Sequence, residues 1–383
     1  MQPTLLYIAA AGLFVLGLAA IGGATFGRQR QRRIVLAVVG LALWGLTLWL
    51  YSRAASFAPT TAPTPTAVVP APTDTPAPEQ PTAAPTEPTP APAEPTPAVP
   101  GLPGRIAFHS DASGDLEIWT MNGDGTDLRQ LTNTPGRDIE PDWSPDGATI
   151  AFSSARDAET DVQLYLMDAD GGNQRRLMPF VAADYLGPRW SPDGQWIAFF
   201  TNVDSTLEVY KVRPDGSELT RLTANASNNF MPDWSPDGRR IVFVSERDRN
   251  RELYVMNADG SNPVRLTNDL AEDIRPRWSP DGQFIVFQSN RDGESNLYLM
   301  PAPGPDVTGP VDQTVRLLTF PVVKNESPAW ALGGQAILFS SDRDSENPNL
   351  PNWELYVMNP DGSDVRRLTF RKGMDRFPAW TGR

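Results

Sequence analysis

A five-residue motif, WSPDG, recurs along this chain and constrains its fold more than any other feature. Intact copies occupy residues 143–147, 190–194, 234–238 and 278–282, a degraded copy, WALGG, occupies 330–334, and a last tryptophan stands at 380. Successive tryptophans are 47, 44, 44, 52 and 50 residues apart. A period in the mid-forties with several strand signals per unit is typical of β-propeller blades. The six tryptophans therefore predict an all-β, six-bladed β-propeller.

Each repeat contains four short segments of strand-forming residues. In the unit around Trp234 they are 232–234, 240–245, 252–256 and 264–267, rich in β-branched and aromatic residues. Tight turns separate them, because SPDG and the later Asp-Gly pairs supply the backbone geometry of hairpins. The repeats span residues 105–383 and start in the middle of a unit. We therefore expect the last strand, near Trp380, to complete the blade begun by residues 105–132 and so close the ring.

In such a propeller, the tight hairpin turns gather on one face and the more variable loops on the other. Binding residues concentrate on variable loops, so the loop face and the channel mouth are the expected site. The residue five positions before each tryptophan forms a nearly all-polar set: Asp138, Tyr185, Asn229, Asp273, Asn325 and Asp375. This set could hold a partner's backbone, a basic peptide or a cation such as Ca²⁺, or it could cap its own loops.

Three other features belong to the candidate site. Just before the tryptophans, Asp142, Arg189, Asp233 and Arg277 alternate in charge, which suits either ion pairs between blades or a ligand. Arg-Asp pairs recur in the loops at 156–157, 247–248, 291–292 and 343–344, and this repetition favours a structural role. An insertion at 345–353 breaks the symmetry, and its Trp353 is a candidate exposed anchor for a partner.

The N-terminal 104 residues predict a membrane anchor and a stalk. Residues 5–26 and 34–51 are charge-free apolar runs, each close to the length of a membrane-spanning helix. Four arginines lie between them, at 28, 30, 32 and 33, so the positive-inside rule places this connection in the cytoplasm and the propeller on the extracytoplasmic side. Residues 1–56 thus form a two-helix membrane anchor. Residues 57–104, rich in proline and threonine, predict a disordered stalk.

The amino-acid composition limits the reactions and ligands that this chain can support. The chain has no cysteine and a single histidine, His109, so disulfides and thiolate chemistry are excluded and imidazole chemistry has one candidate. Residues 105–383 carry 28 basic and 42 acidic residues, a balance that opposes binding of nucleic-acid phosphates. No G-x-S-x-G motif for a serine nucleophile is present. We expect a non-catalytic protein without a metal or other cofactor, although a pair of carboxylates for glycoside cleavage stays open.

The WSPDG, LYVM-x-x-DG and RLT elements of residues 105–383 resemble the TolB-like β-propeller repeat family. This resemblance implies the propeller fold and a domain that docks proteins. The Tol-Pal members carry a separate N-terminal α/β domain, and here a membrane hairpin and stalk stand in its place. The expected function is binding of a protein or peptide at the cell envelope by a monomeric head. The alternative is a carbohydrate-binding or glycan-cleaving propeller.

Overall fold

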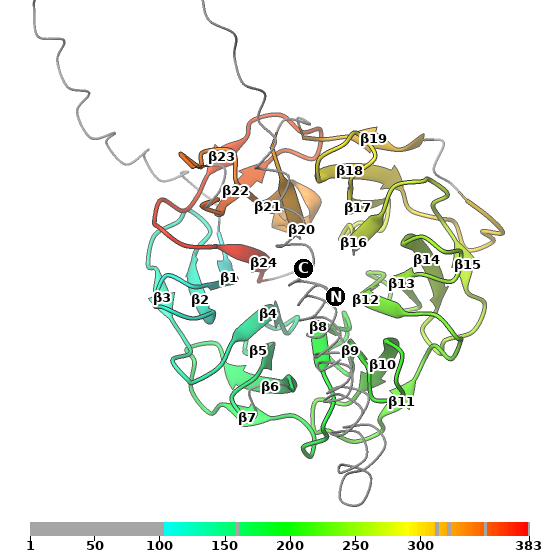
Figure 1. Cartoon of the computed structure of the whole chain (residues 1–383), viewed down its shortest axis with the longest axis horizontal. Helices are drawn as coiled ribbons and strands as arrows, with labels where there is room; N and C mark the ends of the chain where they lie inside the picture. The colour runs from blue at the N-terminus through cyan, green and yellow to red at the C-terminus, as the bar shows by residue number, and fades with distance from the viewer. Residues whose placement is uncertain (1–102, 158–160, 311–313, 320–322, 348–350, 382–383) are drawn as a thin grey trace, which may run out of the picture. The chain divides into compact units, whose positions relative to one another are not determined.

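The structure of the protein, a computed structural model, describes residues 103–157, 161–310, 314–319, 323–347 and 351–381. These residues form six four-stranded antiparallel sheets set around one axis (Figure 1). The predicted six-bladed, all-β propeller is confirmed. The predicted membrane helices at 5–26 and 34–51, and residues 57–102 of the predicted stalk, lie outside the described residues. Within the described ranges, no helix has the length and apolar character needed to cross a bilayer.

Every blade has an inner strand at the axis, two middle strands and a short outer strand. The inner strands are β24 (Arg376–Trp380), β4 (Asp138–Trp143), β8 (Tyr185–Trp190), β12 (Asn229–Trp234), β16 (Asp273–Trp278) and β20 (Asn325–Ala331). The second strands are β1 (Arg105–Ser110), β5 (Thr149–Ser154), β9 (Ile197–Thr201), β13 (Arg240–Ser245), β17 (Phe284–Ser289) and β21 (Ala336–Ser341). The third strands are β2 (Glu117–Asn122), β6 (Gln163–Asp168), β10 (Glu208–Val212), β14 (Glu252–Asn257), β18 (Asn296–Pro301) and β22 (Glu354–Met358). The outer strands are β3 (Arg129–Gln130), β7 (Arg175–Arg176), β11 (Thr220–Arg221), β15 (Val264–Arg265), β19 (Arg316–Leu317) and β23 (Arg366–Arg367), and a short 3-10 turn, η2 (Leu332–Gly334), follows β20.

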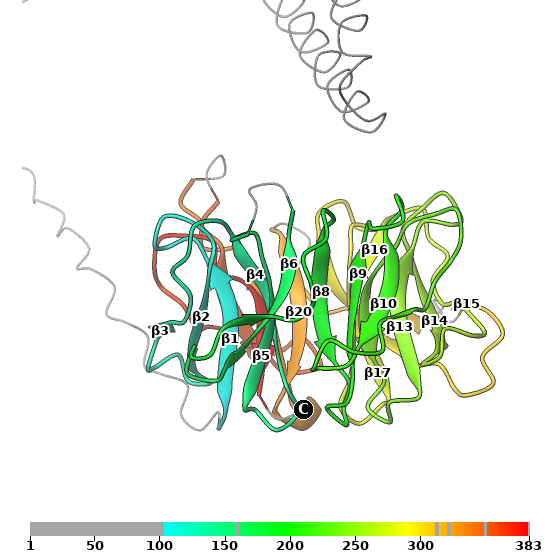
Figure 2. The same cartoon turned by 90° about the horizontal axis from the view of Figure 1, so that it is seen from below.

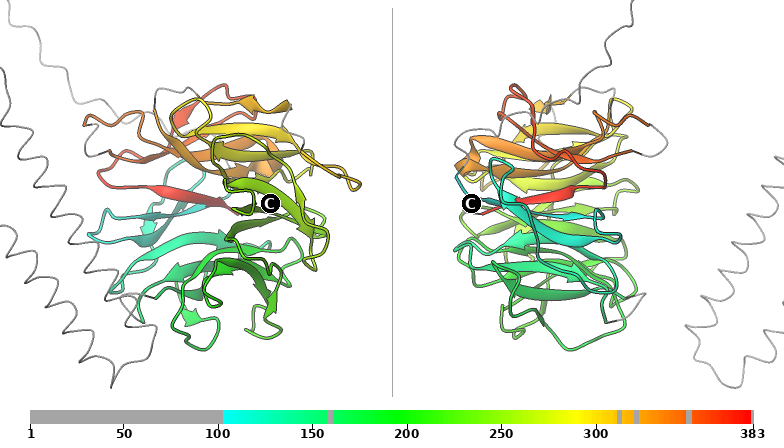
Figure 3. Two further views of the ribbon diagram at one scale, coloured as in Figure 1. Left: turned by 45° about the vertical axis from the view of Figure 1, so that its right-hand side comes forward. Right: turned by 90° about the vertical axis from the view of Figure 1, so that its left-hand side faces the viewer.

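The ring closes with one C-terminal strand and three N-terminal strands, as predicted. Blade 1 has the strand order β24-β1-β2-β3, and blades 2 to 6 follow in chain order from β4 to β23. Figures 1 and 3 show β24, in red, beside β1, in cyan. Ile106 pairs with Trp380 in this ladder, and the backbone N–H of Arg105 donates to the Thr381 hydroxyl over 2.9 Å. Closure therefore joins the two ends of the propeller by strand pairing.

The strands run between two faces of the disc, seen edge-on in Figure 2. We call one the hairpin face, formed by the turns between first and second strands and between third and outer strands. We call the other the loop face, formed by the connections between second and third strands and those from one blade to the next. The loop-face connections are residues 111–116, 155–162, 202–207, 246–251, 290–295 and 342–353 within blades, and 131–137, 177–184, 222–228, 266–272, 318–324 and 368–375 between blades. Of these, residues 158–160, 320–322 and 348–350 lie outside the described residues.

The SPDG sequence builds the hairpin turns by local hydrogen bonds. In blade 2, the Gly147 N–H donates to the Ser144 carbonyl over 2.8 Å. The Asp146 carboxylate accepts from the Ser144 hydroxyl at 2.5 Å and from the Ala148 N–H at 3.0 Å. Gly147 has φ of 70°, a conformation that favours glycine. These aspartates are turn formers, as their spacing predicted.

The core lies between adjacent blades and repeats with them. One phenylalanine from each second strand is fully buried: Phe108, Phe152, Phe199, Phe243, Phe287 and Phe339. In five blades this ring packs on a tyrosine of the third strand, with Phe339 and Tyr356 centroids 5.6 Å apart, for example. The six tryptophans of the repeat are buried as well. Stacked sheets thus shield the recurring aromatic residues from water.

The inner strands bend at a bulge just before each proline. The residue at this point has a positive φ in all six blades: Glu140, Gly187, Met231, Arg275, Ser327 and Phe377. The strand ladder shifts register here, as between Ile274 and Arg277 in blade 5. Proline lacks an N–H and fits a strand at a bulge. The repeated bulge re-aims one side chain per blade and brings several of them to the channel.

Candidate functional site

Five residues of the predicted polar set begin the inner strands and the sixth, Asp375, directly precedes β24; all six side chains are buried. Four of them bond to an arginine from the second-to-third-strand loop of the same blade. The nitrogen-to-oxygen distances are 2.8 Å for Arg156–Asp138, 3.2 Å for Arg247–Asn229, 2.8 Å for Arg291–Asp273 and 2.7 Å for Arg343–Asn325. We expected this set at the channel mouth, but it lies inside the blades. A buried carboxylate requires a cationic or hydrogen-bonding partner, and the loop arginine supplies it.

The Arg-Asp loops are therefore a structural pairing, as their repetition indicated. Each arginine also lies over aromatic rings of its own blade, as Arg291 does 4.9 Å from the Tyr298 centroid. The following aspartate, Asp292, accepts from the Tyr298 hydroxyl over 2.6 Å. Blade 3 has no arginine in this loop, and there the strand begins with the apolar-packed Tyr185, 5.7 Å from the Phe199 ring. Blade 1 also has no arginine in this loop, and its Asp375 pairs instead with Arg371 of the connection from blade 6, at 3.0 Å.

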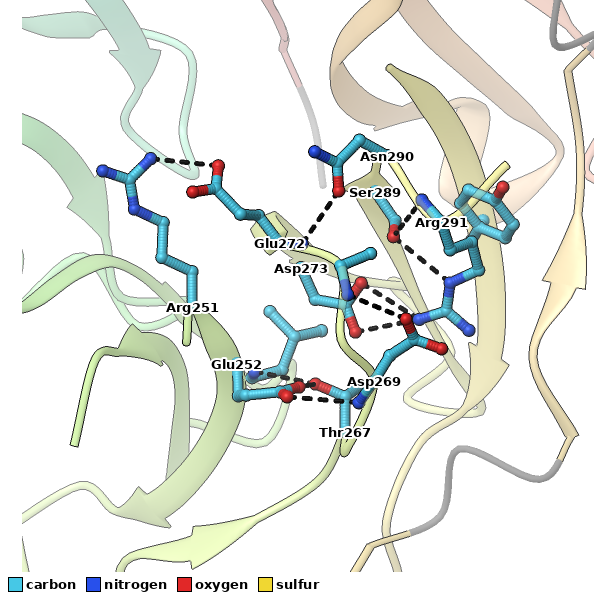
Figure 4. A network of polar contacts seen from close by, with 12 residues as sticks. Arg251, Glu252, Thr267, Asp269, Glu272, Asp273, Ser289, Asn290 and Arg291 are labelled. Carbon is cyan, nitrogen blue, oxygen red and sulfur yellow. Dashed lines mark hydrogen bonds and ion pairs between the residues drawn. The ribbon is translucent and has the colours of Figure 1, made fainter. Parts of the chain in front are cut away.

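Figure 4 shows this network where blades 4 and 5 meet. Asp273 accepts two hydrogen bonds from Nη2 of Arg291, at 3.0 and 2.8 Å. Burial raises the pKa of Asp273, while Ser289 and Arg291 oppose that rise. Close by, the Glu272 N–H donates to the Asn290 side chain over 2.9 Å, and Arg251 pairs with Glu272 at 3.2 Å. The connection from blade 4 to blade 5 is held rigidly by these bonds.

A second buried polar position escaped the sequence reasoning. The third strand begins with a buried glutamate in four blades: Glu117, Glu208, Glu252 and Glu354. The threonine of the RLT element donates to it, as Thr267 does to Glu252 over 2.6 Å, and accepts from the backbone of Leu253 at 3.0 Å. The joint recurrence of this glutamate and the RLT threonine was the signal that could have revealed it.

Blade 1 differs from the others at this position. Arg221, Arg265 and Arg367 pair with the glutamates of blades 3, 4 and 6 at 2.9, 2.7 and 2.7 Å. Gln130 replaces that arginine in blade 1, where its amide donates to the Thr132 carbonyl over 2.8 Å. Burial raises the pKa of Glu117 to about 7. Glu117 is thus a buried carboxyl that lacks the arginine of its counterparts.

The structure contradicts the prediction that Trp353 is exposed. We expected an exposed anchor, but its side chain is 5% exposed. The Trp353 carbonyl accepts from the Asp375 N–H over 2.8 Å, and Arg376 lies 4.5 Å from its ring centroid. Trp353 thus lies against the last inner strand, because burial of a large apolar ring is favourable. This residue supports the closure of blade 1.

The middle of the channel is lined by charged and aromatic side chains. Nδ1 of His109 accepts from the Glu140 N–H over 3.2 Å, and its ring lies 4.8 Å from that of Phe377. Burial, aided by Arg376 and Arg275, lowers the pKa of His109 to about 3. This histidine is therefore neutral near physiological pH and a weak base. A small cavity of about 10 Å³ adjoins Glu140 and Phe377, roughly the room that one water needs.

The alternating charges before the tryptophans lie where the inner strands reach the hairpin face. Trp190 donates its backbone N–H to Asp142 over 2.9 Å, from one blade to the next. Arg189 lies 3.9 Å from the same carboxylate, an ion pair between blades of the kind that the alternating charges suggested. The carbonyl of Arg189 accepts from the indole N–H of Trp234 over 3.2 Å. These residues serve packing between blades and also line a cavity.

That cavity, the hairpin-face funnel, has a volume of about 170 Å³. Its wall combines the charged residues with tryptophans and prolines of the SPDG turns. The lining residues used below are Asp142, Arg189, Asp233, Arg277, Ala329 and Ala379 at the inner strands, and Trp330 and Trp380 beside them. Of the predicted site residues, the structure brings Arg189 and Arg277 together here, on the face opposite to the one expected.

The loop face carries exposed apolar side chains. Leu270, between blades 4 and 5, is fully exposed, and Phe370, between blades 6 and 1, is half exposed. Phe180, Val181 and Val203 are exposed on the loops of blades 2 and 3. The other exposed large apolar residues among those described lie in or directly before the outer strands: Leu128, Leu219, Leu317 and Val365. Large contiguous apolar patches mark surfaces that contact another protein, whereas single exposed apolar side chains occur on most protein surfaces.

The described residues offer no cluster of three or more histidine, cysteine, aspartate or glutamate side chains that could hold a metal ion. In the predicted ring, Asp138, Asp273 and Asp375 each form an ion pair with an arginine. These carboxylates are therefore already neutralised by cations, unlike the oxygen ligands that a calcium ion gathers.

Comparison with known sequences places this architecture in a family. A family model described as the TolB beta propeller domain matches residues 96–229 and 163–311, more than half of the chain. A "Protein TolB homolog" of Chlorobium luteolum is 35% identical over 117 residues, which are 30% of this chain and 26% of that protein. The "Tol-Pal system protein TolB" of Nitratidesulfovibrio vulgaris is 42% identical over 43 residues, 11% and 10% of the two chains. The chain thus spans about a quarter or less of the length of these relatives.

Two solved structures share the fold. TolB from Acinetobacter baumannii superposes with a TM-score of 0.61 at 23% identity, over 73% of this chain and 66% of that one. A putative TolB from Agrobacterium tumefaciens superposes with a TM-score of 0.57 at 23% identity, over 71% and 91% of the two chains. These likenesses concern the propeller. With its repeats, ring closure and family match, the chain belongs to the TolB-like β-propeller family.

Proposed function

We propose that this chain is a non-catalytic, membrane-anchored propeller on the extracytoplasmic side of the cell envelope, which binds a protein or peptide partner through its loop face. The observation that carries the proposal is the set of apolar side chains exposed there, led by Leu270 and Phe370. A fully exposed leucine side chain contributes no burial free energy to the free protein. Its burial in a complex would contribute about 2 kcal/mol to the free energy of binding. The names of the TolB relatives, with one in the Tol-Pal system, agree with a role at the envelope.

The attachment of the chain favours the loop face for this role. Gly104 accepts from the N–H of Gly123 over 2.9 Å, beside a turn of the hairpin face. The residues before 104 therefore join the propeller at the hairpin face. The loop face lies at the opposite end of the strands from this connection. Loops also tolerate variation in sequence better than hairpin turns do.

The test compares loop-face and edge variants of the full-length chain by chemical crosslinking in the host cell and quantitative mass spectrometry. We expect Leu270→Ser with Phe370→Ser to lose the crosslinked partner. Leu128→Ser with Leu219→Ser, which removes two exposed leucines beside the outer strands, is the matched control and should retain it. Equal loss in both double variants, or none in either, would contradict the proposal. Recovery of envelope glycan in place of protein would favour the carbohydrate alternative.

The membrane arrangement has a separate test. Because the chain contains no cysteine, a single introduced thiol reports its own position. We expect Leu270→Cys to react with a membrane-impermeant maleimide in cells whose outer layers are permeabilised but whose cytoplasmic membrane is intact. Gln31→Cys, between the two predicted helices, should react only after lysis. The reverse labelling pattern would place the propeller inside the cell.

A further inference from the structure

The hairpin-face funnel has two unlike walls. Blades 2 to 5 contribute Asp142, Arg189, Asp233 and Arg277 at the position before the tryptophan, whereas blades 6 and 1 contribute Ala329 and Ala379. One side of the funnel is therefore charged and the other is apolar, backed by tryptophan rings. The symmetry of the repeat is broken here. A site for an amphipathic ligand needs this division.

Two guanidinium groups form the inner end of the funnel. Arg189 and Arg277 line both the funnel and the small cavity behind it, so they form a waist between the two spaces. Their side chains are more than nine-tenths buried. Each donates a hydrogen bond to the carbonyl of the proline before it, at 2.7 Å for Arg189 and 3.2 Å for Arg277. Nε of Arg189 has no hydrogen-bond partner although it is buried. An unsatisfied buried donor is costly, and an anionic group at the waist would satisfy it.

The two acidic residues of the wall are already engaged. Asp142 accepts from the backbone of Trp190 at 2.9 Å, and Asp233 from that of Trp278 at 2.8 Å. Behind the waist, Arg275 and Glu140 both line the small cavity, and Arg275 also pairs with Glu326 at 3.3 Å. Arg189 also faces Asp142 at 3.9 Å. A guanidinium group has five N–H donors, so Nε of Arg189 remains available after these contacts. This favours an anion over a cation.

The rim of the funnel is preformed. The proline of each SPDG turn lies against the glycine of the next blade, so that a Cβ on Gly282 would come within 3.3 Å of Pro236. The same contact recurs around the mouth, with Pro145 beside Gly194 and Pro192 beside Gly238. Interlocked turns hold the wall in place without a ligand. A rigid pocket loses little entropy on binding.

We propose that the hairpin-face funnel binds a carboxylate carried on a flat apolar group, with the carboxylate at Arg189 and Arg277 and the apolar group against Ala329, Ala379 and Trp380. The volume of about 170 Å³ compares with the roughly 150 Å³ of an engineered cavity that holds benzene. A guanidinium group binds a carboxylate with two parallel hydrogen bonds, a match that an amine or an amide cannot make. The carboxylate could come from a small acid or from a peptide with a C-terminal aromatic residue.

The probe is phenylacetate, titrated into the full-length chain in detergent while tryptophan fluorescence is followed, because tryptophans line the funnel. We expect a dissociation constant on the order of 1 mM, as for other ligands of this size. Phenylacetamide and phenethylamine, which replace the carboxylate by a neutral and a cationic group, should not bind. Equal binding of the acid and the amide, tighter binding of the amine, or no binding of any acid would overturn the proposal.

Arg277→Met tests the role of the waist. It keeps the backbone carbonyl that accepts from the Trp330 indole at 3.1 Å, and it should weaken phenylacetate binding by about 10-fold or more. Arg239→Met, an exposed arginine on the same face outside the funnel, is the matched control and should bind as the wild type does. Unchanged affinity in Arg277→Met would contradict the assignment. Should that variant not fold, the comparison of acid and amide on the wild type decides.

A second pair of probes separates the two sources of the carboxylate. The tripeptide Gly-Gly-Phe with a free C-terminus is compared with its C-terminal amide. Binding of the free peptide but not of the amide supports a peptide end as the ligand. Binding of phenylacetate alone supports a small acid. Equal binding of the free peptide and its amide would show that the carboxylate is not recognised and would overturn the proposal.

Discussion

The backbone N–H of Trp278 in blade 5 donates a hydrogen bond to the carboxylate of Asp233 in blade 4 over 2.8 Å. Asp142 and Trp190 make the same bond between blades 2 and 3 at 2.9 Å. At the next interface of each pair, the indole of Trp234 or Trp330 donates to the carbonyl of an arginine. Two kinds of polar bond thus alternate over the four consecutive interfaces from blade 2 to blade 6, and they join neighbouring blades beside the tryptophans.

Loss of the Asp233 carboxylate should destabilise the propeller. Asp233→Ala leaves the buried Trp278 N–H without this acceptor, which should lower the free energy of unfolding by about 1.5–3 kcal/mol. Asp233→Asn keeps an oxygen for the same bond and should cost less. Urea denaturation of the purified protein measures both changes. Equal losses in the two variants would show that the hydrogen bond is not the cause.

The arginines of the loop pairs should differ in importance according to the charge of their partner. Arg291→Met leaves the buried carboxyl of Asp273 without its cation, and should lower the free energy of unfolding by about 3–5 kcal/mol. Arg247→Met is the matched change in blade 4, where the partner is the neutral Asn229, and about 1–2 kcal/mol is expected. Both arginines stack on a tyrosine, at 4.9 and 4.4 Å, so the difference isolates the charge. Equal costs would contradict this explanation.

Glu117 should make the stability of the propeller depend on pH. Burial raises its pKa from 4.5 to about 7, so the folded protein binds this proton more tightly than the unfolded chain does. Its contribution to stability is complete below pH 4.5 and is lost as the pH rises through 7. Gln130→Arg supplies the cation found in blades 3, 4 and 6 and should lower the pKa of Glu117 again.

The difference in free energy of unfolding between Gln130→Arg and the wild type should grow with pH. Gln130→Arg should match the wild type within about 0.5 kcal/mol at pH 5 and exceed its free energy of unfolding by about 1–2 kcal/mol at pH 8. Urea denaturation at a series of pH values measures it. Lys211→Arg, a conservative change at a site remote from blade 1, controls for general effects of mutation. A constant difference between pH 5 and 8 would exclude Glu117 as the titrating group.

Most of the fold could be predicted from the sequence because it depends on local and periodic signals. The spacing of the tryptophans predicted the number of blades. Because the repeats start in the middle of a unit and end at Trp380, they also predicted the closure between β24 and β1. Turn chemistry gave the hairpins, since SPDG bonds within itself. The assignment of loops and turns to opposite faces followed from strand alternation and is confirmed.

The candidate site was harder to predict because it depends on contacts between distant residues. Asp138 looked like a ligand by position, but its partner, Arg156, lies 18 residues away. Trp353 looked exposed because it ends an insertion, and only the fold shows its contact with Asp375. The funnel was missed because tight turns suggested a closed surface. Arg189 and Arg277 were noted, yet which cavity they line depends on how six blades meet.

The most direct test of the central claim is photocrosslinking from a single position in living cells. A photoreactive phenylalanine analogue at Leu270 places the reactive group on the loop face, and the same analogue at Arg239 places it on the hairpin face. We predict one discrete crosslinked protein from position 270 and none of that mass from position 239. The same adduct from position 239 alone, or no adduct at position 270 while the protein is folded and exported, would contradict the claim that the loop face is the docking surface.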